Sequence, residues 1–270
     1  MGIANMFADY HIHTFLSGDA KGEILDCVKI AFNKKLEEIG ISDHYIPKRF
    51  KDKLDQPPAY EKLSDYVKKV CDYKRKIKGA VKLKVGVEVD FVPGFEDEIK
   101  DALKGLPLDY IIGSVHFIEG WAFDNPKYII EYQKLNSLKL YEKYFTAVQT
   151  CADSKLFDVI GHPDLIKKFG YKPKTDITDL YVATAKVFKD NGVCIEVNTS
   201  GLRHPCKEIY PDKQFLKICF DEGVQITFGS DAHTPEDIGM DFDRALSLIK
   251  EVGYEFVTTF TGRRKQFKEV

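Results

Sequence analysis

The feature that most limits the fold of this chain is a regular alternation of short apolar runs with amphipathic stretches. Several runs are apolar almost throughout, as in Tyr110-Ile111-Ile112-Gly113-Ser114-Val115, which is typical of strands covered on both faces in parallel sheets. The predicted strands are residues 6–11, 38–42, 83–90, 109–116, 157–161, 193–198 and 224–230. Seven such units in 270 residues predict an α/β fold, a parallel (β/α) barrel of seven or eight strands. An open doubly wound sheet is the alternative, and the absence of a glycine-rich dinucleotide fingerprint and of a P-loop disfavours it as a nucleotide-binding sheet.

Helical periodicity lies between the predicted strands. Three stretches place apolar residues on one helical face, through Leu63, Val67, Val70 and Ile77, through Leu138, Tyr141, Phe145 and Val148, and through Ile238, Phe242, Ala245 and Ile249. Glycine adopts positive φ at little cost, so glycines that follow helical stretches predict C-terminal caps, namely at Gly79, Gly192, Gly223 and Gly253. Thr234-Pro235-Glu236-Asp237 has the residue order of a helix N-terminus.

No stretch rich in proline, glycine or serine divides the chain, so we expect one domain over residues 1–270. The formal net charge of −2 argues against nucleic-acid and membrane-surface partners. We find no basic N-terminal region before an apolar run and no membrane-length apolar segment, which predicts a cytoplasmic protein. The six cysteines form no Cys-x-x-Cys pair, so reduced thiols are expected rather than a zinc ribbon.

Two polar segments follow predicted strands, where a barrel builds the wall of its active site. Residues 45–58 form the longer segment and residues 117–126 the shorter one. We interpret the basic residues of the longer segment as solubilising charges; they are Lys48, Arg49, Lys51 and Lys53.

Most of the seven histidines lie at the carboxyl end of a predicted strand or just after it. These are His11, His13, His44, His116, His162 and His233. In a parallel barrel such ends face a single mouth, and residues i and i+2 of a strand share a face, so His11 and His13 point together. Imidazoles gathered in this way indicate a site for divalent metal ions. For any one of them alone, a structural histidine is the alternative.

Carboxylates accompany these histidines. Glu88 and Asp90 lie inside an apolar run, where a buried acid is costly unless it is paired or binds a metal. Asp231 precedes His233 by two residues, and Asp19 lies in a turn, where a capping role is the alternative. With Glu88, Asp231 and Asp19 the set has six histidines, one glutamate and two aspartates, which indicates two or three ions. Nitrogen and oxygen ligands without thiolates favour zinc, manganese or iron.

The order of these motifs resembles the polymerase-and-histidinol-phosphatase (PHP) family, in particular its stand-alone histidinol-phosphate phosphatases. The motifs are His11-Ile12-His13-Thr14, Ser42-Asp43-His44, Gly161-His162-Pro163 and Gly229-Ser230-Asp231-Ala232-His233-Thr234, and the subgroup is suggested by Gly113-Ser114-Val115-His116-Phe117 and Asn198-Thr199-Ser200-Gly201-Leu202-Arg203. The resemblance extends from about residue 9 to residue 239. It implies a distorted (β/α)7 TIM-like barrel with a trinuclear metal centre at the carboxyl-end mouth.

The resemblance also implies how three ions share the ligands. The first ion would take His11, His13, Glu88 and Asp231, the second would share Glu88 and add His116 and His162, and the third would take Asp19, His44 and His233. In many relatives the position of Asp19 is a histidine.

The activity implied by the resemblance is metal-dependent hydrolysis of L-histidinol phosphate, a small phosphate monoester, to L-histidinol and phosphate in histidine biosynthesis. The attacking group would be a hydroxide that bridges two ions, with Glu88 as the bridging ligand. Asp231 or His233 would handle the proton given to the leaving group. The alternatives are a broader phosphoesterase or nuclease-like phosphodiesterase, and a non-enzymatic metal-binding protein.

Arg203 is the first candidate for binding phosphate outside the metal cluster, since a guanidinium matches phosphate oxygens in a bidentate way. A solvated loop arginine is the alternative. Glu119 would pair with the substrate amine and Trp121 would form a wall for the imidazole, because both follow His116 closely. We expect His204, beside Arg203, to make no contact with the substrate.

Overall fold

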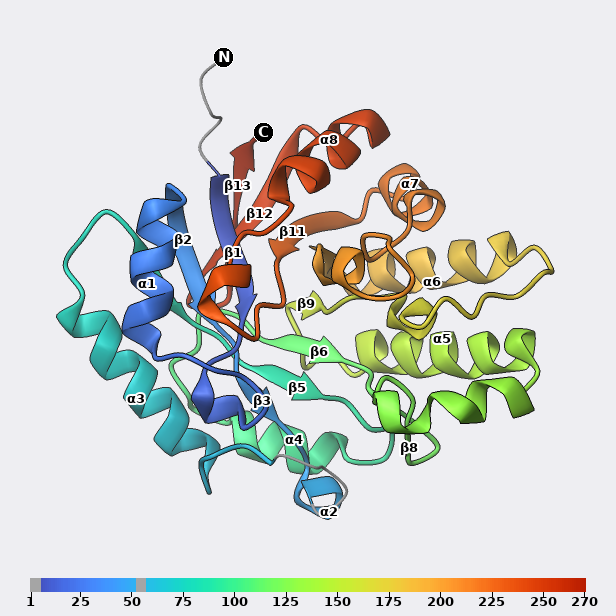
Figure 1. The fold of residues 1–270 in the computed structure, drawn as a ribbon, viewed down its shortest axis with the longest axis horizontal. Coiled ribbons are helices and arrows are strands. Elements are labelled where there is room, and N and C mark those ends of the chain that lie inside the picture. The colour runs from blue at the N-terminus through green and yellow to red at the C-terminus, as the bar shows by residue number, and fades with distance from the viewer. Residues whose placement is uncertain (1–5, 52–56) are drawn as a thin grey trace.

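The computed structural model describes residues 6–51 and 57–270, and it arranges the predicted strands as a ring of parallel strands (Figure 1). The strands are β1 Met6–Ile12, β2 Leu36–Ile41, β3 His44–Tyr45, β4 Lys82–Val85, β5 Glu88–Asp90, β6 Ile112–Ser114, β9 Val159–Ile160, β10 Cys194–Asn198 and β11 Gln225–Gly229. Hydrogen bonds join these strands into two sheets, one in the order β1-β2-β4 and the other in the order β3-β5-β6-β9-β10-β11. The ring closes where Ile12, the last residue of β1, forms a parallel bridge with Ala232, three residues beyond the end of β11.

Interrupted strands distort the ring. The predicted run 83–90 is divided into β4 and β5 at Gly86. The backbone nevertheless continues across the interruption, because the Gly86 N–H donates to the Ile41 carbonyl at 2.9 Å and the Glu88 N–H donates to the Ser42 carbonyl at 3.2 Å. The pairs β2–β4 and β3–β5 therefore occupy the same two positions of the barrel, and the predicted seven-position (β/α) barrel is confirmed.

Helices cover the outside of the ring, with α1, α3 and α4 on one side and α5 to α8 on the other (Figure 1). The α-helices are α1 Ile24–Asn33, α2 Lys48–Lys51, α3 Leu63–Lys76, α4 Glu96–Leu103, α5 Ser137–Asp153, α6 Thr178–Asn191, α7 Lys213–Asp221 and α8 Phe242–Val252. Short 3-10 turns are η1 Phe15–Ser17, η2 Pro126–Lys134, η3 Leu165–Lys167, η4 Ser200–Arg203 and η5 Pro235–Asp237. Within the described ranges, no helix combines the length and the apolar character that crossing a membrane requires.

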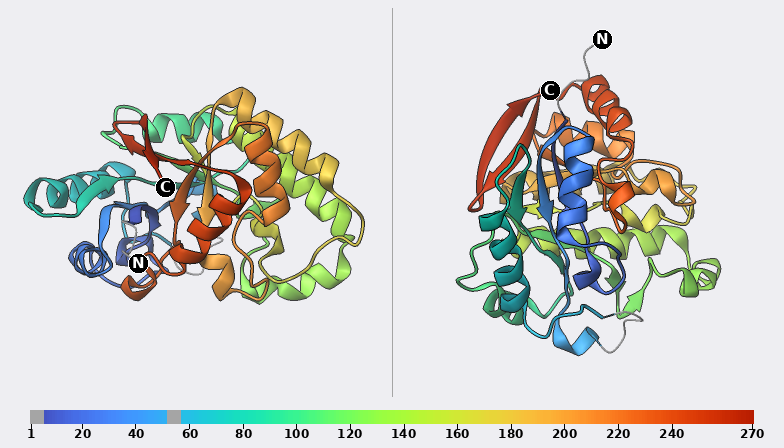
Figure 2. Two further views of the ribbon diagram at one scale, coloured as in Figure 1. Left: turned by 90° about the horizontal axis from the view of Figure 1, so that it is seen from above. Right: turned by 60° about the vertical axis from the view of Figure 1, so that its left-hand side comes forward.

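A C-terminal hairpin, which the sequence pattern did not indicate, closes the barrel at the end where β1 begins (Figure 2). It consists of β12 Phe256–Thr261 and the largely polar β13 Arg264–Glu269. Phe260 is buried in an inner cluster with Tyr10 and Tyr110, and its N–H donates to Tyr10 Oη at 3.1 Å. Lys84 Nζ donates to the Phe260 carbonyl at 2.5 Å and lies 3.5 Å from Glu38 Oε2. This paired polar and aromatic layer fills one end of the barrel and leaves the carboxyl ends of the strands as its mouth.

Three of the four predicted glycines lie where a helix ends, and one does not. Gly192 and Gly253 cap α6 and α8 with φ of 62° and 118°, as predicted, and Gly223 follows α7 with φ of 74°. The prediction for Gly79 is wrong, because α3 already ends at Lys76 and Gly79 has no positive φ.

The predicted helix start at Thr234 is confirmed in part: Thr234 and Pro235 take the N-cap and first positions, but of a short 3-10 turn and not of an α-helix. Thr234 precedes only the 3-10 turn η5, and its side chain makes no capping hydrogen bond. The following helix α8 begins at Phe242, so Ile238 of the predicted apolar face lies before it.

The two predicted loops contain secondary structure. Residues 117–126 include a small hairpin of β7 Phe117–Ile118 and β8 Trp121–Ala122. Residues 45–58 begin in β3 and include α2, while residues 52–56, and with them Lys53, lie outside the described residues.

Replacing Gly40 by alanine should destabilise the barrel. A Cβ at Gly40 would lie 2.0 Å from Tyr110 Oη, which is held by a 2.6 Å hydrogen bond to the Tyr10 carbonyl. We expect Gly40→Ala to lower the free energy of unfolding by about 1–3 kcal/mol in urea denaturation. Gly79→Ala is the matched control, since a Cβ there meets no atom within 4 Å, and it should change stability by less than about 0.5 kcal/mol. Equal stability of the two variants would contradict the close packing of Tyr110 on β2.

Candidate metal centre

The end of β1 directs His11 and His13 into the mouth of the barrel. The pairing of β1 with β2 shifts register between Asp9 and Ile12, which breaks the strict alternation of the strand. As a result Tyr10 belongs to the inner cluster, whereas Ile12 packs in the outer core. Irregularities of this kind re-aim side chains next to functional sites. Both imidazoles are buried.

The buried Glu88 carboxylate, at the start of β5, is the centre of a cluster of imidazoles. Its Oε2 lies 3.0 Å from His44 Nδ1, 3.2 Å from His11 Nε2 and 3.4 Å from His13 Nε2, and its Oε1 lies 3.1 Å from His162 Nε2 and 3.7 Å from His116 Nε2. These residues come from β1 and β3 and from the ends of β6 and β9. Strand ends far apart in the sequence therefore converge, as the geometry of a parallel barrel requires.

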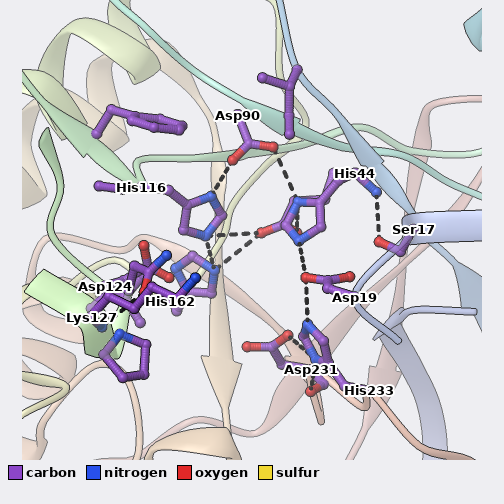
Figure 3. Close-up of a pocket in the computed structure, with 17 residues that line it drawn as sticks. Ser17, Asp19, His44, Asp90, His116, Asp124, Lys127, His162, Asp231 and His233 are labelled. Carbon is purple, nitrogen blue, oxygen red and sulfur yellow. Dashed lines mark hydrogen bonds and ion pairs between the residues drawn. The ribbon is translucent and has the colours of Figure 1, made fainter. Parts of the chain in front are cut away.

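Two further carboxylates extend the cluster toward solvent (Figure 3). Asp231 Oδ1 lies 3.4 Å from His13 Nε2 and 3.5 Å from His233 Nδ1. Asp19 Oδ2 lies 3.4 Å from His233 Nε2 and 3.6 Å from His44 Nε2. The structure thus brings every predicted ligand residue into one connected cluster, and it directs Asp19 toward two imidazoles.

The cluster contains ligand atoms that the protein itself does not satisfy. His11 Nε2, His13 Nε2 and Glu88 Oε2 are buried and have no hydrogen-bond partner among the described residues. In addition, His116 Nε2 and His162 Nε2 face each other at 3.3 Å. Buried polar atoms without partners are costly, and imidazole nitrogens and carboxylate oxygens without thiolates suit a divalent transition metal. The residues present therefore fit metal ions.

The donor atoms form overlapping groups. Four sets of three residues have ligand atoms within 4.8 Å of one another: His13, His44 and His233; His11, Glu88 and His162; His11, His13 and Asp231; and His44, Glu88 and His116. Because these sets share residues, the cluster offers adjacent metal positions rather than separate ones.

Charge within the cluster is balanced between carboxylates and imidazoles. Burial alone raises the pKa of Glu88, but the neighbouring His11 and His44 outweigh burial and hold this pKa well below its usual range. Burial, together with the neighbouring His233, lowers the pKa of His13 to about 4. His13 is therefore neutral at pH 7, which is the form of histidine that binds a metal.

Asp90 contacts two of the imidazoles through their Nδ1 atoms. Its Oδ1 lies 2.5 Å from His116 Nδ1, and its Oδ2 lies 3.1 Å from His44 Nδ1 (Figure 3). Carboxylates in this position fix the tautomer and ring orientation of a ligating histidine. The sequence marked Asp90 as a buried acid without assigning it this role.

Glu196, on β10, is a functional residue that was not predicted. Its Oε1 lies 2.7 Å from His11 Nδ1, and its Oε2 accepts a 2.8 Å hydrogen bond from the backbone N–H of His162. Gly229 on the neighbouring strand makes room for it, since a Cβ there would lie 1.7 Å from Glu196 Oε1. The sequence signal was present, because Glu196 is an acid within an apolar run, as Glu88 is.

Arg203 does not line the cavity over the cluster. Its Nη2 donates to the carbonyls of Ser230 at 2.5 Å and Asp231 at 3.3 Å, and its buried Nη1 has no hydrogen-bond partner in the described part of the chain. Arg203 thus holds the segment that carries Asp231. Neighbouring His204 is likewise absent from the cavity wall.

Glu119 and Trp121 also lie outside the lining of this cavity, so the structure does not bring them to the metal cluster. Glu119 is at the turn of the β7–β8 hairpin, where its side chain is 71% exposed and its Oε2 lies 2.7 Å from Lys143 Nζ. The Trp121 ring packs against Tyr132, with ring centroids 5.1 Å apart. The hairpin, which the sequence pattern did not indicate, turns both side chains away.

A cavity of about 450 Å³ opens over the cluster (Figure 3). Most ligand residues form one side of it. The remaining lining residues are Ser17, Ile46, Asp90, Phe117, Ala122, Asp124, Asn125, Pro126, Lys127 and Leu165. A cavity of this size suits a small molecule.

Comparison with known families and proteins agrees with this geometry. The PHP domain family matches residues 9–200. The chain is similar to a "Probable histidinol-phosphatase" of Deinococcus radiodurans, with 34% identity over 96% of this chain and 98% of that protein. It is also similar to a "Histidinol-phosphatase" of Bacillus subtilis, with 28% identity over 88% of this chain and 97% of that protein.

A solved structure has the same fold. It is the crystal structure of histidinol phosphate phosphatase from Lactococcus lactis subsp. lactis, complexed with zinc, L-histidinol and phosphate. The TM-score is 0.81 at 22% identity, and the match covers 96% of this chain and 98% of that one.

Replacing Asp90 by asparagine should weaken metal binding. The amide keeps one acceptor oxygen, so it can orient only one of the two imidazoles that Asp90 contacts. We expect Asp90→Asn to lower the affinity for zinc about 10- to 100-fold in competition with a chromogenic chelator. Asp190→Asn, at an exposed position of α6, should leave the affinity unchanged. Unaltered zinc affinity in Asp90→Asn would show that this carboxylate does not support the metal ligands.

Proposed function

This chain belongs to the PHP domain family, and from that premise we infer that it is a metal-dependent histidinol-phosphatase. It hydrolyses L-histidinol phosphate to L-histidinol and phosphate. The relatives named histidinol-phosphatase match almost the whole chain, and the Lactococcus lactis protein of the same fold binds zinc, L-histidinol and phosphate.

One observation in this chain carries the proposal. Glu88 lines a cavity large enough for a small phosphate monoester, and the buried, unpartnered Nε2 atoms of His11 and His13 lie 3.2 and 3.4 Å from its Oε2. A protein that binds metal only for stability has a closed ligand shell. Here the cluster opens to the cavity through Asp19, Asp231 and His233, which supports catalysis.

We propose that the site holds two or three zinc, manganese or iron ions. In this assignment the first ion takes His11, His13, Glu88 and Asp231, the second takes Glu88, His116 and His162, and the third takes Asp19, His44 and His233. The distances from Glu88, Asp231 and Asp19 to the imidazoles support this division.

Bound ions of this kind supply positive charge to the phosphate oxygens and lower the pKa of water toward ~7. The protein supplies the placement. Glu88 contacts imidazoles through both of its oxygens. Asp90 and Glu196 hold the rings of His44, His116 and His11 through their Nδ1 atoms. A site that is organised before the substrate arrives needs little rearrangement during the reaction.

The leaving alcohol needs a proton at its ester oxygen. Asp231 and His233 are the proposed groups for this transfer, because they line the solvent side of the cluster and their side chains lie 3.5 Å apart. Arg203 is proposed to contribute to phosphate binding. Its hydrogen bonds to the carbonyls of Ser230 and Asp231 support an indirect contribution, in which Arg203 positions the segment that carries Asp231.

Substrate specificity tests the proposal directly. The protein loaded with zinc, manganese or iron should release phosphate from L-histidinol phosphate far faster than from phenyl phosphate or glycerol phosphate. Removal of the ions with a chelator should abolish this release, and adding them back should restore it. Equal rates on all monoesters would leave a general phosphatase, and no release from any of them would remove the proposed function.

Replacing Glu88 by glutamine should separate chemistry from folding. Loss of the central carboxylate removes a ligand shared by two proposed ions, so we expect kcat to fall by more than about 100-fold. Far-UV circular dichroism should still show the folded barrel, because the outer core does not include Glu88. Glu61→Gln, an exposed glutamate just before α3, is the matched control and should retain full activity. If Glu88→Gln unfolds the protein, the cluster is structural.

A further inference from the structure

Asp124 is a carboxylate of the cavity wall that the metal cluster does not use. Five carboxylates line the cavity, and four of them contact cluster imidazoles: Asp19, Glu88, Asp90 and Asp231. Asp124, two residues after β8, instead has its Oδ2 3.3 Å from Lys168 Nζ. Its other oxygen accepts no hydrogen bond from any residue in the described ranges.

Asp124 lines the same cavity as the residues of the metal cluster. Figure 3 shows it next to Lys127, on the side of the cluster away from Asp19. Burial raises the pKa of Asp124, but Lys168 and the cluster residue His116 outweigh burial and lower it. Its carboxylate is therefore ionised at neutral pH and close to the metal ligands, and it is 24% exposed.

Outside the cluster, the cavity wall has an apolar part formed by Ile46, Phe117, Ala122, Pro126 and Leu165, and a polar part formed by Ser17, Asn125 and Lys127. A phosphate monoester whose phosphate lies at the cluster places its carbon skeleton against this wall. The first polar group of that skeleton then lies near Asp124. An ionised carboxylate in a partly desolvated cavity favours a cationic donor, because such charge-assisted hydrogen bonds are about twice as strong as neutral ones.

We propose that Asp124 binds the substrate ammonium group and makes the cavity selective for amine-bearing phosphate monoesters. In L-histidinol phosphate the ammonium is on the carbon next to the phosphorylated methylene, so it is the first polar group beyond the ester. Lys168 holds Oδ2 and leaves Oδ1 for the ligand. The inference rests on the proposed phosphatase function and names the group that reads its substrate.

Asp124 thereby takes the role that sequence position suggested for Glu119. Glu119 is mostly exposed, pairs with Lys143 and lines a different surface depression. Only Asp124 of these two carboxylates faces the metal cluster.

A pair of substrates tests the proposal. One is L-histidinol phosphate, and the other is 3-(imidazol-4-yl)propyl phosphate, which lacks only the amine. In the metal-loaded parent protein kcat/KM should be higher for the amine-bearing substrate. Asp124→Asn should lower kcat/KM for that substrate roughly 10- to 100-fold, mainly through KM, and leave kcat/KM for the amine-free substrate unchanged. Asp124→Ser should give the same selective loss, and both variants should keep the parent metal content and circular dichroism spectrum.

The other outcomes overturn the proposal in distinct ways. A parent protein that hydrolyses neither compound removes the proposed function and this inference together. A parent that hydrolyses both equally well keeps the phosphatase but shows that the amine is not read. Equal losses on both substrates in Asp124→Asn assign Asp124 to phosphate binding or structure. A selective loss in Glu119→Gln, with Asp124→Asn unaffected, would move the role to Glu119.

Discussion

A buried carboxylate surrounded by imidazoles is the interaction on which the geometry of the whole metal centre depends. Glu88 lies in a strand with almost no exposure, so its charge must be compensated where it is. Five histidines from four strands surround it, and His11 and His44 among them hold its pKa low. Their convergence requires parallel strands closed into a ring, because only then do the carboxyl ends meet at one mouth. The interruption between β4 and β5 lies two residues before Glu88, next to the site it shapes.

Behind the ligands lies a second layer of carboxylates, and this layer explains why the site is rigid. Asp90 contacts the Nδ1 atoms of His44 and His116, and Glu196 contacts the Nδ1 atom of His11 and the backbone N–H of His162. A histidine held through its second nitrogen presents the first in a fixed direction. The cluster is therefore organised by the barrel itself, and the more exposed residues Asp19 and His233 complete it on the solvent side.

The convergence of these histidines and carboxylates could be predicted because two simple regularities decide it. Apolar runs identify the strands, and the parallel barrel fixes which end of each strand faces the mouth, so a histidine at a strand end has a known direction. Loop residues lack such a rule: Glu119 and Asp124 are five positions apart, and only the β7–β8 hairpin decides which of them faces the cavity. The strand β13 was not predicted, for a different reason. Its side chains are mostly polar and exposed, so no apolar alternation marks it.

The hairpin at the closed end of the barrel has a consequence for how the protein forms. β1 completes the ring with β11, and Phe260 packs in the interior against Tyr10. Some contacts of the first strand are therefore made with residues as far as 250 positions later in the chain. Contacts of such high sequence separation slow folding, since the loop must close before they contribute. On the ribosome the first strand therefore has its neighbour β2 early, but it remains without its contacts to Ala232 and Phe260 until most of the chain has been made. The cluster of histidines and carboxylates joins residues 11 to 233 in the same way, so it is complete only after most of the chain has been made.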